Sequence, residues 1–381
     1  MIKPEQFLEF LETKDISFFT GVPDSLLQAF CIALFNKFGT SNANHIVAVN
    51  EGNAVALGAG YHLATGKTPL VYLQNSGLGN IVNPATSLTD PAVYGIPIVY
   101  IVGWRGEPGI HDEPQHVKQG KITCDLLDVL KIPYMIIDKN TTLLTIESEF
   151  LNRFDSCMEN GGSVAIVVRK GAFDKPQGEF PFQQAILQRE DVIKKIADNT
   201  GDKDFIIATT GKISRELFEY RKTMESPFKQ HDFLTVGSMG YASTIALSVA
   251  LQHKDKTVWC IDGDGAVLMH MGSLATIGTM RPSNLIHVVL NNASHESVGG
   301  MPTVAKRIDL PSIARAVGYP QALRVHNEDE LTNVLDNLKT YSEGPIFIEI
   351  FVSSGSRSDL IRPNTTPEEN KIAFMHALKG N

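Results

Sequence analysis

The chain of 381 residues has only four cysteines, no low-complexity tract and no excess of positive charge. The cysteines are scattered without a CxxC pair, which is typical of small buried side chains in a reducing compartment. The net charge of −8 gives no general attraction for nucleic acid or for an anionic membrane surface. We therefore expect neither as a partner, and an anionic ligand would need a local set of donors.

Long apolar runs are also missing from the sequence. The longest, residues 92–104, is interrupted by Gly95, Pro97 and Gly103 and is too short for a membrane span. Residues 1–15 mix acidic side chains with Phe and Leu and lack the apolar core of a signal peptide. These features together predict a cytoplasmic location.

Shorter apolar runs of strand length recur along the chain, separated by segments long enough for helices. They are 16–22, 45–49, 69–74, 97–103, 134–138 and 164–170 in the first half, then 204–211, 233–237, 257–263, 285–292, 322–325 and 346–352. The runs are continuous rather than alternating, as expected of strands covered by helices on both faces. The sequence therefore predicts two doubly wound α/β domains, each with a parallel sheet of six strands. We expect these domains at 1–170 and 189–381, joined by a turn-rich linker, 171–188, with no middle domain.

One apolar run ends in two acidic residues that alternate with glycines, "VWCIDGDGAV" at 258–267. Asp262 and Asp264 follow the run at the point where a strand would give way to a helix, and open α/β sheets bind their ligands there. The backbone N–H groups of Gly265 and Ala266 would be available to an anion. By itself, however, such a motif is most often a turn in which glycines supply positive φ.

A second run ends in Asn291 and Asn292, and residues 266–290 separate it from the first motif. That length holds one helix and one strand, so the two motifs would lie at neighbouring strand ends on the same edge of the sheet. A carboxylate and a carboxamide would converge there. Both supply oxygen ligands of the kind that Mg²⁺ takes while it keeps phosphate oxygens in its shell.

With this spacing, the sequence resembles the thiamine diphosphate enzymes, whose motif is GDG, roughly two dozen residues, then NN. The resemblance implies that Asp264, Asn292 and the carbonyl oxygen of Ser294 bind Mg²⁺. It also implies that Met239, in "TVGSMGYA" at 235–242, bends the cofactor. The other residues expected to contact the cofactor are Thr210, Gly211, Lys212, Gly237, Ser238, Gly263, Gly265 and Ala266.

The segment "HIVAVNEGNAVALGAGYHLATG" at 45–66 resembles the family segment that carries an activating glutamate. The resemblance implies that Glu51 forms a hydrogen bond to N1′ of the cofactor's pyrimidine and promotes loss of the proton at C2 of the thiazolium. Taken alone, a solvated carboxylate at a helix N-terminus is the simpler interpretation. In the family, the pyrimidine domain of one subunit faces the diphosphate domain of another, so the resemblance implies at least a homodimer.

The segments 21–27, 74–91, 103–116 and 355–375 resemble the compact decarboxylases of this family, which have no middle domain. The resemblance covers essentially the whole chain. It implies decarboxylation of a small, highly anionic 2-oxo acid that carries a phosphonate, with a sulfonate-bearing acid as the alternative. Carboligation and a regulatory protein that binds the cofactor without turnover are more distant possibilities. Glu51 argues against the last, because binding alone would not need that base.

Several candidates for substrate binding and proton transfer lie at strand ends of the first half. Arg105 offers a fork suited to carboxylate or phosphonate, and His111 or His116 could transfer protons near neutral pH. The loop 103–116 that contains them could also be an ordinary solvated loop. Asp24, at the end of the first strand, is a further catalytic candidate. Gln74, Asn75 and His295 are the remaining candidates for substrate contacts.

Overall fold

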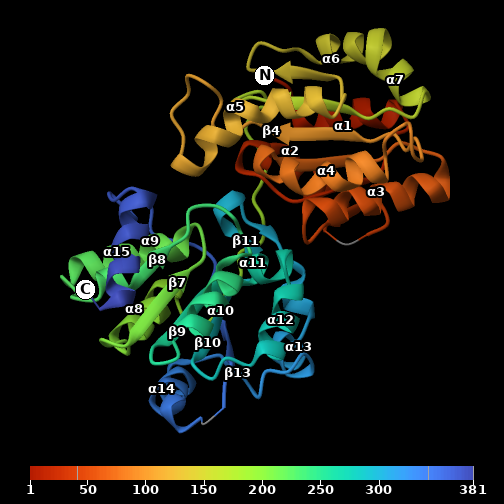
Figure 1. The fold of residues 1–381 in the computed structure, drawn as a ribbon. Helices are drawn as coiled ribbons and strands as arrows, with labels where there is room; N and C mark the ends of the chain where they lie inside the picture. Colours follow the sequence, from red (N-terminus) through yellow and green to blue (C-terminus); the bar gives the residue numbers. More distant parts are fainter. Residues whose placement is uncertain (41, 342, 381) are drawn as a thin grey trace. The chain divides into compact units, whose positions relative to one another are not determined.

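The structure is a computed structural model of the chain that describes residues 1–40, 42–341 and 343–380. It divides into two compact units (Figure 1). The N-terminal unit contains Met1–Pro181 and Val298–Pro302, and the C-terminal unit contains Phe182–Ser297 and Thr303–Asn381. The chain first passes from the N-terminal to the C-terminal unit after Pro181. Nothing in the sequence indicated that residues 298–302 would pack with the first unit, where the Sδ atom of Met301 lies 3.8 Å from the Tyr72 hydroxyl.

The N-terminal unit is built on a six-stranded parallel sheet in the order β2-β1-β3-β4-β6-β5. The strands are β1 (Phe19–Gly21), β2 (His45–Val47), β3 (Leu70–Gln74), β4 (Val99–Gly103), β5 (Tyr134–Ile137) and β6 (Val164–Val168). One face is covered by α1 (Pro4–Thr13), α2 (Gln28–Phe38), α6 (Leu143–Glu149) and the helical turn Phe150–Phe154, which leads into α7 (Asp155–Glu159). The other face is covered by α3 (Glu51–Thr65), α4 (Leu78–Ser87) and α5 (Pro114–Val129).

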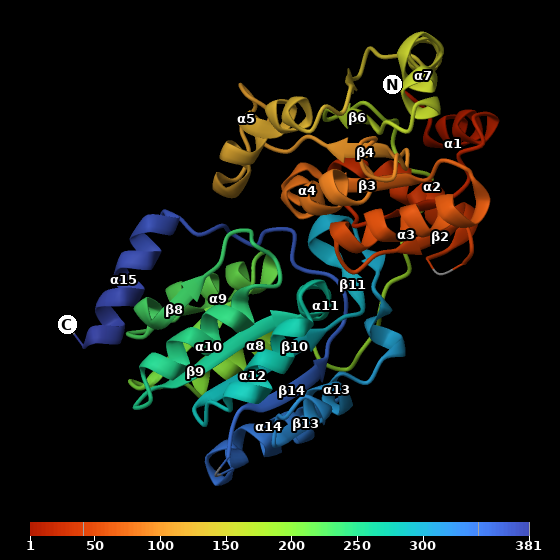
Figure 2. The same ribbon diagram turned by 45° about the vertical axis from the view of Figure 1, so that its right-hand side comes forward.

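The C-terminal unit repeats this plan with the order β13-β14-β10-β9-β7-β8 (Figure 2). Its strands are β7 (Asp204–Ala208), β8 (Asp232–Leu234), β9 (Thr257–Gly263), β10 (Leu285–Asn291), β13 (Gln321–Val325) and β14 (Ile346–Phe351). Helices α8 (Arg189–Asp198), α9 (Lys212–Thr223) and α14 (Glu328–Asn337) pack on one face. Helices α10 (Ala242–Gln252), α12 (Gly272–Met280), α13 (Leu310–Ala316) and α15 (Pro367–Lys379) pack on the other. The short strand β11 (Ser294–His295) follows β10, whereas β12 (Met301–Pro302) belongs to the N-terminal unit.

The two sheets have the same topology. Numbering the six strands of each unit in chain order gives 2-1-3-4-6-5 in both. The prediction of two doubly wound, six-stranded parallel sheets is therefore confirmed, and every predicted run overlaps a strand. In each sheet, the direction of winding reverses between the first and third strands, and ligands of open α/β sheets bind at the carboxyl ends around such a point.

Local signals explain where the elements that flank these points begin. Helix α3 begins at Glu51 because the Asn50 side chain caps it, accepting a hydrogen bond of 2.9 Å from the backbone N–H of Asn53. Helix α9 begins after Gly211, whose φ of 97° lies in a region that side chains other than glycine's rarely adopt. Among the described residues, no helix combines the length and the apolar character needed to cross a membrane.

Candidate active site

Glu51 is a buried carboxylate at the start of α3, only 5% exposed. Its Oε2 atom accepts a hydrogen bond of 2.7 Å from Nδ2 of Asn80 on α4. Its Oε1 and Cγ atoms lie against the backbone of Gly77, so closely that a Cβ at that position would overlap them. The interpretation of Glu51 as a solvated carboxylate is therefore wrong, because the side chain is buried and its position is fixed by two neighbours. Asn80 was not identified from the sequence.

Asp24 and Gln74 meet at the switch point between β1 and β3. The Gln74 side chain donates to Oδ1 of Asp24 at 2.5 Å, and the backbone N–H of Leu26 donates to Oδ2 at 3.0 Å. Asp24 is completely buried, and this burial raises its pKa, although the bond from Gln74 and the charge of Arg105 act in the opposite direction. The structure thus brings the buried acid Asp24 close to Gln74 and Arg105, two of the residues that we expect to bind the substrate.

Asp112 organises the loop that carries Arg105 and His116. The guanidinium of Arg105 binds it through Nε at 2.8 Å and Nη2 at 2.5 Å, and Nδ1 of His116 lies 2.9 Å from its Oδ1. Burial alone would raise the pKa of Asp112, but the hydrogen bonds from Arg105 and His116 lower it well below its usual range. The loop is therefore a structured ion-pair network, and Asp112 is a functional candidate that the sequence analysis did not assign.

Arg105 was expected to offer its guanidinium to the substrate, but hydrogen bonds within the protein already occupy this group. Its third nitrogen, Nη1, donates to the Ser25 hydroxyl at 3.0 Å. Asn75 supports the same loop, because its Nδ2 atom donates to the backbone oxygen of Arg105 at 2.8 Å and its Oδ1 accepts from the backbone N–H at 3.1 Å. Asn75 is fully buried, so it holds the loop rather than offering a polar group to solvent. His111, by contrast, is exposed.

In the C-terminal unit, Asp264 is the first residue of α11 (Asp264–Met269), directly after β9, and is 2% exposed. Its Oδ2 atom accepts a hydrogen bond of 2.5 Å from the Thr303 hydroxyl. Burial raises the pKa of Asp264 from its usual value to about 7. A carboxylate in such surroundings is stabilised by a cation, and Thr303 is a neighbour that no motif in the sequence indicated.

The two asparagines at the end of β10 have different surroundings. Asn291 points into the fold, where its Nδ2 atom donates to Glu349 on β14 at 2.8 Å and its Oδ1 accepts from the backbone N–H of Ala293. Asn292 accepts from the backbone N–H of Ser294 at 3.1 Å and donates to Glu296 at 2.7 Å. The two carboxamides thus bond in the same way, but to different glutamates, and the assignment of Asn292 as the metal ligand stays a prediction.

Met239 and His295 enclose the turn at Gly265. A Cβ at Gly265 would lie 3.2 Å from the Cε atom of Met239 and 3.2 Å from Nδ1 of His295. Burial lowers the pKa of His295 to about 4, so its imidazole is neutral at neutral pH. The segment that carries Met239 is shaped by positive φ values at Gly237 and Ser238.

The other residues that we expect to contact the cofactor lie at the strand ends around this turn. The Thr210 hydroxyl accepts a hydrogen bond of 2.8 Å from the backbone N–H of Gly237, so the loops after β7 and β8 are joined. Lys212, at the start of α9, donates to the Ser356 hydroxyl at 2.6 Å, and partial burial lowers its pKa. Gly263 and Ala266 lie on either side of the Asp264–Gly265 pair.

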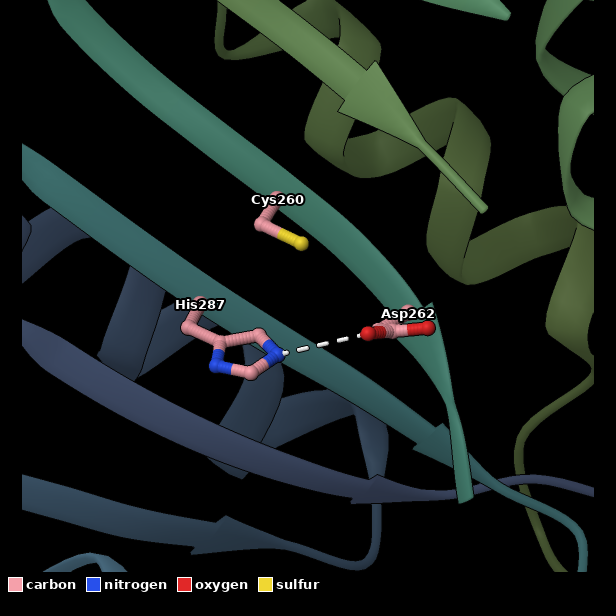
Figure 3. Close-up of side chains that lie close together, drawn as sticks. All are labelled: Cys260, Asp262 and His287. Atoms are coloured by element: carbon pink, nitrogen blue, oxygen red, sulfur yellow. Dashed lines mark ion pairs between the residues drawn. The ribbon is translucent and has the colours of Figure 1, made fainter. Parts of the chain in front are cut away.

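A buried pair supports the same turn from within the sheet (Figure 3). Asp262 on β9 and His287 on β10 are both fully buried, with Nε2 of His287 3.7 Å from Oδ2 of Asp262. The other carboxylate oxygen of Asp262 accepts from the backbone N–H of Gly263 at 3.0 Å. Cys260 lies on the same face of β9, and burial raises the pKa of its thiol. Asp262 thus fixes the start of the turn that carries Asp264.

Comparisons with known proteins identify the family of both α/β domains. Residues 4–129 match the family described as thiamine pyrophosphate enzyme, N-terminal TPP binding domain, and residues 209–350 match the C-terminal TPP binding domain of the same enzymes. Thiamine pyrophosphate is a synonym of thiamine diphosphate. The chain belongs to the thiamine diphosphate-dependent enzymes.

Several proteins of similar sequence are decarboxylases. The chain is 35% identical over 370 residues to the phosphonopyruvate decarboxylase of Streptomyces viridochromogenes, covering 92% of this chain and 88% of the relative. It is 34% identical over 393 residues to the phosphonopyruvate decarboxylase of Streptomyces hygroscopicus, covering 97% and 92%. It is also 41% identical over 193 residues to the sulfopyruvate decarboxylase subunit beta of Methanocaldococcus jannaschii, covering 50% of this chain and 97% of the relative.

Proposed function

We propose that this chain decarboxylates phosphonopyruvate to phosphonoacetaldehyde and carbon dioxide, using thiamine diphosphate and Mg²⁺. The observation that carries the proposal is its 35% identity, over 370 residues, to an enzyme of that name. The similarity extends through both cofactor-binding domains, and residues 130–208 between the two matched ranges contain no additional domain. The product aldehyde would serve phosphonate biosynthesis.

Residues of the C-terminal unit would hold the cofactor. Thiamine diphosphate, when bound, supplies the electron sink that decarboxylation of a 2-oxo acid requires. Asp264, Asn292 and the carbonyl oxygen of Ser294 would bind Mg²⁺, since they offer the oxygen ligands that this ion prefers. The raised pKa of Asp264, about 7, is consistent with a site that a cation completes. Met239 would fix the conformation of the bound cofactor.

Residues of the N-terminal unit would carry out the proton transfers and bind the substrate. Glu51 would exchange a proton with N1′ of the pyrimidine, and its bond from Asn80 would keep the carboxylate in place. His116 is held through Nδ1 by Asp112, which leaves Nε2 as the atom able to give or take a proton. Arg105 would attract the anionic substrate. Ser25 is the partner that it can release, because a hydroxyl is a neutral acceptor whereas the Asp112 carboxylate carries a negative charge.

The proposal also covers the oligomeric state of the protein and its location in the cell. We place the chain in a homo-oligomer, at least a dimer, in which Glu51 of one subunit and Asp264 of another would contribute to one active site. A cytoplasmic location is consistent with cysteines that are all free in the structure.

Sulfopyruvate decarboxylation is the second candidate, because a subunit of such an enzyme is 41% identical to this chain over 193 residues. A substrate panel separates the two. We expect carbon dioxide release from phosphonopyruvate, dependent on thiamine diphosphate and Mg²⁺, with a kcat/KM well above those for sulfopyruvate and pyruvate. A preference for sulfopyruvate would assign the second function. Tight cofactor binding without turnover of any 2-oxo acid would favour a regulatory protein.

A further inference from the structure

Asn292, the proposed metal ligand, is hydrogen-bonded to a network of ion pairs that is largely buried. The Nδ2 atom of Asn292 donates to Oε2 of Glu296 at 2.7 Å, and Nη1 of Arg189 donates to the same oxygen at 2.6 Å. A carboxylate oxygen of Glu296 thus joins Asn292 to a guanidinium from the start of α8. Neither Glu296 nor Arg189 belongs to the GDG or NN motifs.

Arg189 is itself held on its other side. Its Nε and Nη2 atoms bind both oxygens of Glu216 on α9, at 2.8 and 2.7 Å, and both side chains are almost fully buried. A guanidinium held by a two-pronged pair of this kind has little freedom to turn. Glu296, with 15% of its side chain exposed, is therefore fixed by a rigid partner.

The network determines which end of the Asn292 carboxamide points toward Glu296. A carboxylate only accepts hydrogen bonds and a carboxamide nitrogen only donates them, so Nδ2 must face Glu296. The oxygen of Asn292 must then face the opposite way, where it accepts from the backbone N–H of Ser294 and keeps a second lone pair. A cation is bound by an oxygen and repelled by an amide N–H group, so this orientation is the one that a metal site requires.

We propose that Glu296, held by Arg189, is a positioning residue that directs the carboxamide oxygen of Asn292 toward the bound cation. The inference rests on the proposed function, because the cation belongs to it. Partners behind a metal ligand typically change metal affinity about tenfold to a hundredfold when they are removed. Losing Glu296 should therefore weaken Mg²⁺ binding to that extent.

Two replacements of Glu296 separate orientation from packing. Glu296→Met keeps the length of the side chain but removes the acceptor of Nδ2, so only the bond from the Ser294 backbone N–H still orients the carboxamide of Asn292. Glu296→Gln can place its oxygen where Oε2 lies and its nitrogen where Oε1 lies, and Oε1 is a buried atom without a hydrogen-bond partner in the described structure. We expect the affinity for Mg²⁺ to decrease in the order wild type, Gln variant, Met variant.

A second substitution tests orientation directly. Asn292→Asp has two equivalent oxygens, so it needs no neighbour to choose between them. In the wild-type background the new carboxylate faces Glu296, and we expect repulsion to weaken Mg²⁺ binding. In the Glu296→Met background the repulsion is gone, and the same change should strengthen Mg²⁺ binding. A role of Glu296 in packing alone predicts that Asn292→Asp has an effect of the same sign in both backgrounds.

The measurement is a calorimetric titration of the full-length, metal-free protein with Mg²⁺ at saturating thiamine diphosphate. Glu328→Met is the matched control, because it removes an exposed carboxylate that pairs with Lys195 on α8 at 2.9 Å but does not contact Asn292. Its Mg²⁺ affinity should equal that of the wild type. Thermal unfolding without metal identifies any variant that has lost its fold.

The outcomes distinguish this inference from the proposed function. Wild-type affinity in the Glu296→Met variant, or effects of Asn292→Asp with one sign in both backgrounds, would overturn the positioning role and leave the proposed function intact. Failure of the wild-type protein itself to bind thiamine diphosphate with Mg²⁺ would overturn both.

Discussion

At the scale of single residues, the proposed chemistry depends on two buried carboxylates, Glu51 and Asp264. Both are almost inaccessible to solvent, and each accepts a hydrogen bond from a neutral side chain, Asn80 or Thr303. Burying a carboxylate without a cation is costly, so such positions are retained where the chemistry needs them. Each of the two residues leads to a prediction.

Glu51→Gln should reduce kcat about 10²–10⁴-fold, the usual contribution of general acid–base catalysis. Glutamine has the same shape and can still accept from Asn80, so the fold and most of the cofactor affinity should remain. Glutamine cannot, however, exchange a proton with N1′. Hydrogen–deuterium exchange at C2 of the bound cofactor, followed by quenched-flow NMR, measures this step without substrate. Exchange as fast as in the wild type would rule out Glu51 as the activator.

Asp264 should make the metal-free protein less stable as the pH rises. Burial raises the pKa of this carboxyl to about 7, from about 3.8 in the unfolded chain. Because the folded protein holds the proton more tightly, this contribution to stability is fully present below about pH 4 and is lost as the pH rises through about 7. Asp264→Asn removes that dependence.

Thermal unfolding of both metal-free proteins between pH 5 and pH 8 tests this expectation, and the difference between their Tm values isolates the contribution of Asp264. The wild-type protein should lose stability relative to the Asn variant as the pH rises. Mg²⁺ with thiamine diphosphate should restore it to the wild type alone. Parallel pH profiles would show that the Asp264 pKa is not raised.

At the scale of elements, the site depends on close approaches between helix starts and strand ends. The turn that contains Gly77, at the start of α4, lies against the Glu51 side chain at the start of α3. Only a residue without a Cβ leaves room for the carboxylate there. The position of Glu51 is therefore set by a second element as well as by its own helix.

Gly77→Ala should consequently displace the Glu51 carboxylate without removing it, and we expect a loss of kcat about as large as that of Glu51→Gln. Gly79→Ala is the matched control, because a Cβ at Gly79 meets no atom within 4 Å. The control should keep wild-type kcat and gain slightly in stability, since alanine favours a helix. Equal activity of the two variants would show that the close approach to Gly77 does not position Glu51.

At the scale of the whole molecule, the two carboxylates belong to different units with the same topology. If an active site combines Glu51 of one subunit with Asp264 of another, two inactive variants should complement each other. A mixed dimer of Glu51→Gln and Asp264→Ala chains would then contain one site with both native residues. The mixed dimer, once separated from the two parental dimers, should show about half of the wild-type activity, as expected for a symmetric dimer with one of its two sites intact.

Co-expression of differently tagged chains, purified by both tags in sequence, provides the mixed oligomer for this assay. Each variant expressed alone provides the inactive reference. No activity in the mixed oligomer above that reference would place both carboxylates of a site in the same chain.

The sequence by itself determined the architecture and the positions of the GDG and NN motifs. Strands buried on both faces leave continuous apolar runs, and the polar residues that follow such runs must lie at one edge of a parallel sheet. The spacing between Asp264 and Asn292 could therefore be interpreted from local pattern alone.

Only the tertiary structure decided the partners of these residues. Asp112 takes two nitrogens of Arg105, Asn75 supports the loop backbone, and Glu296 binds Asn292 together with an arginine far away in the sequence. No short-range pattern encodes such pairs, because they depend on how loops from separate strand ends pack against one another. For the same reason, the packing of residues 298–302 with the N-terminal unit could not be predicted.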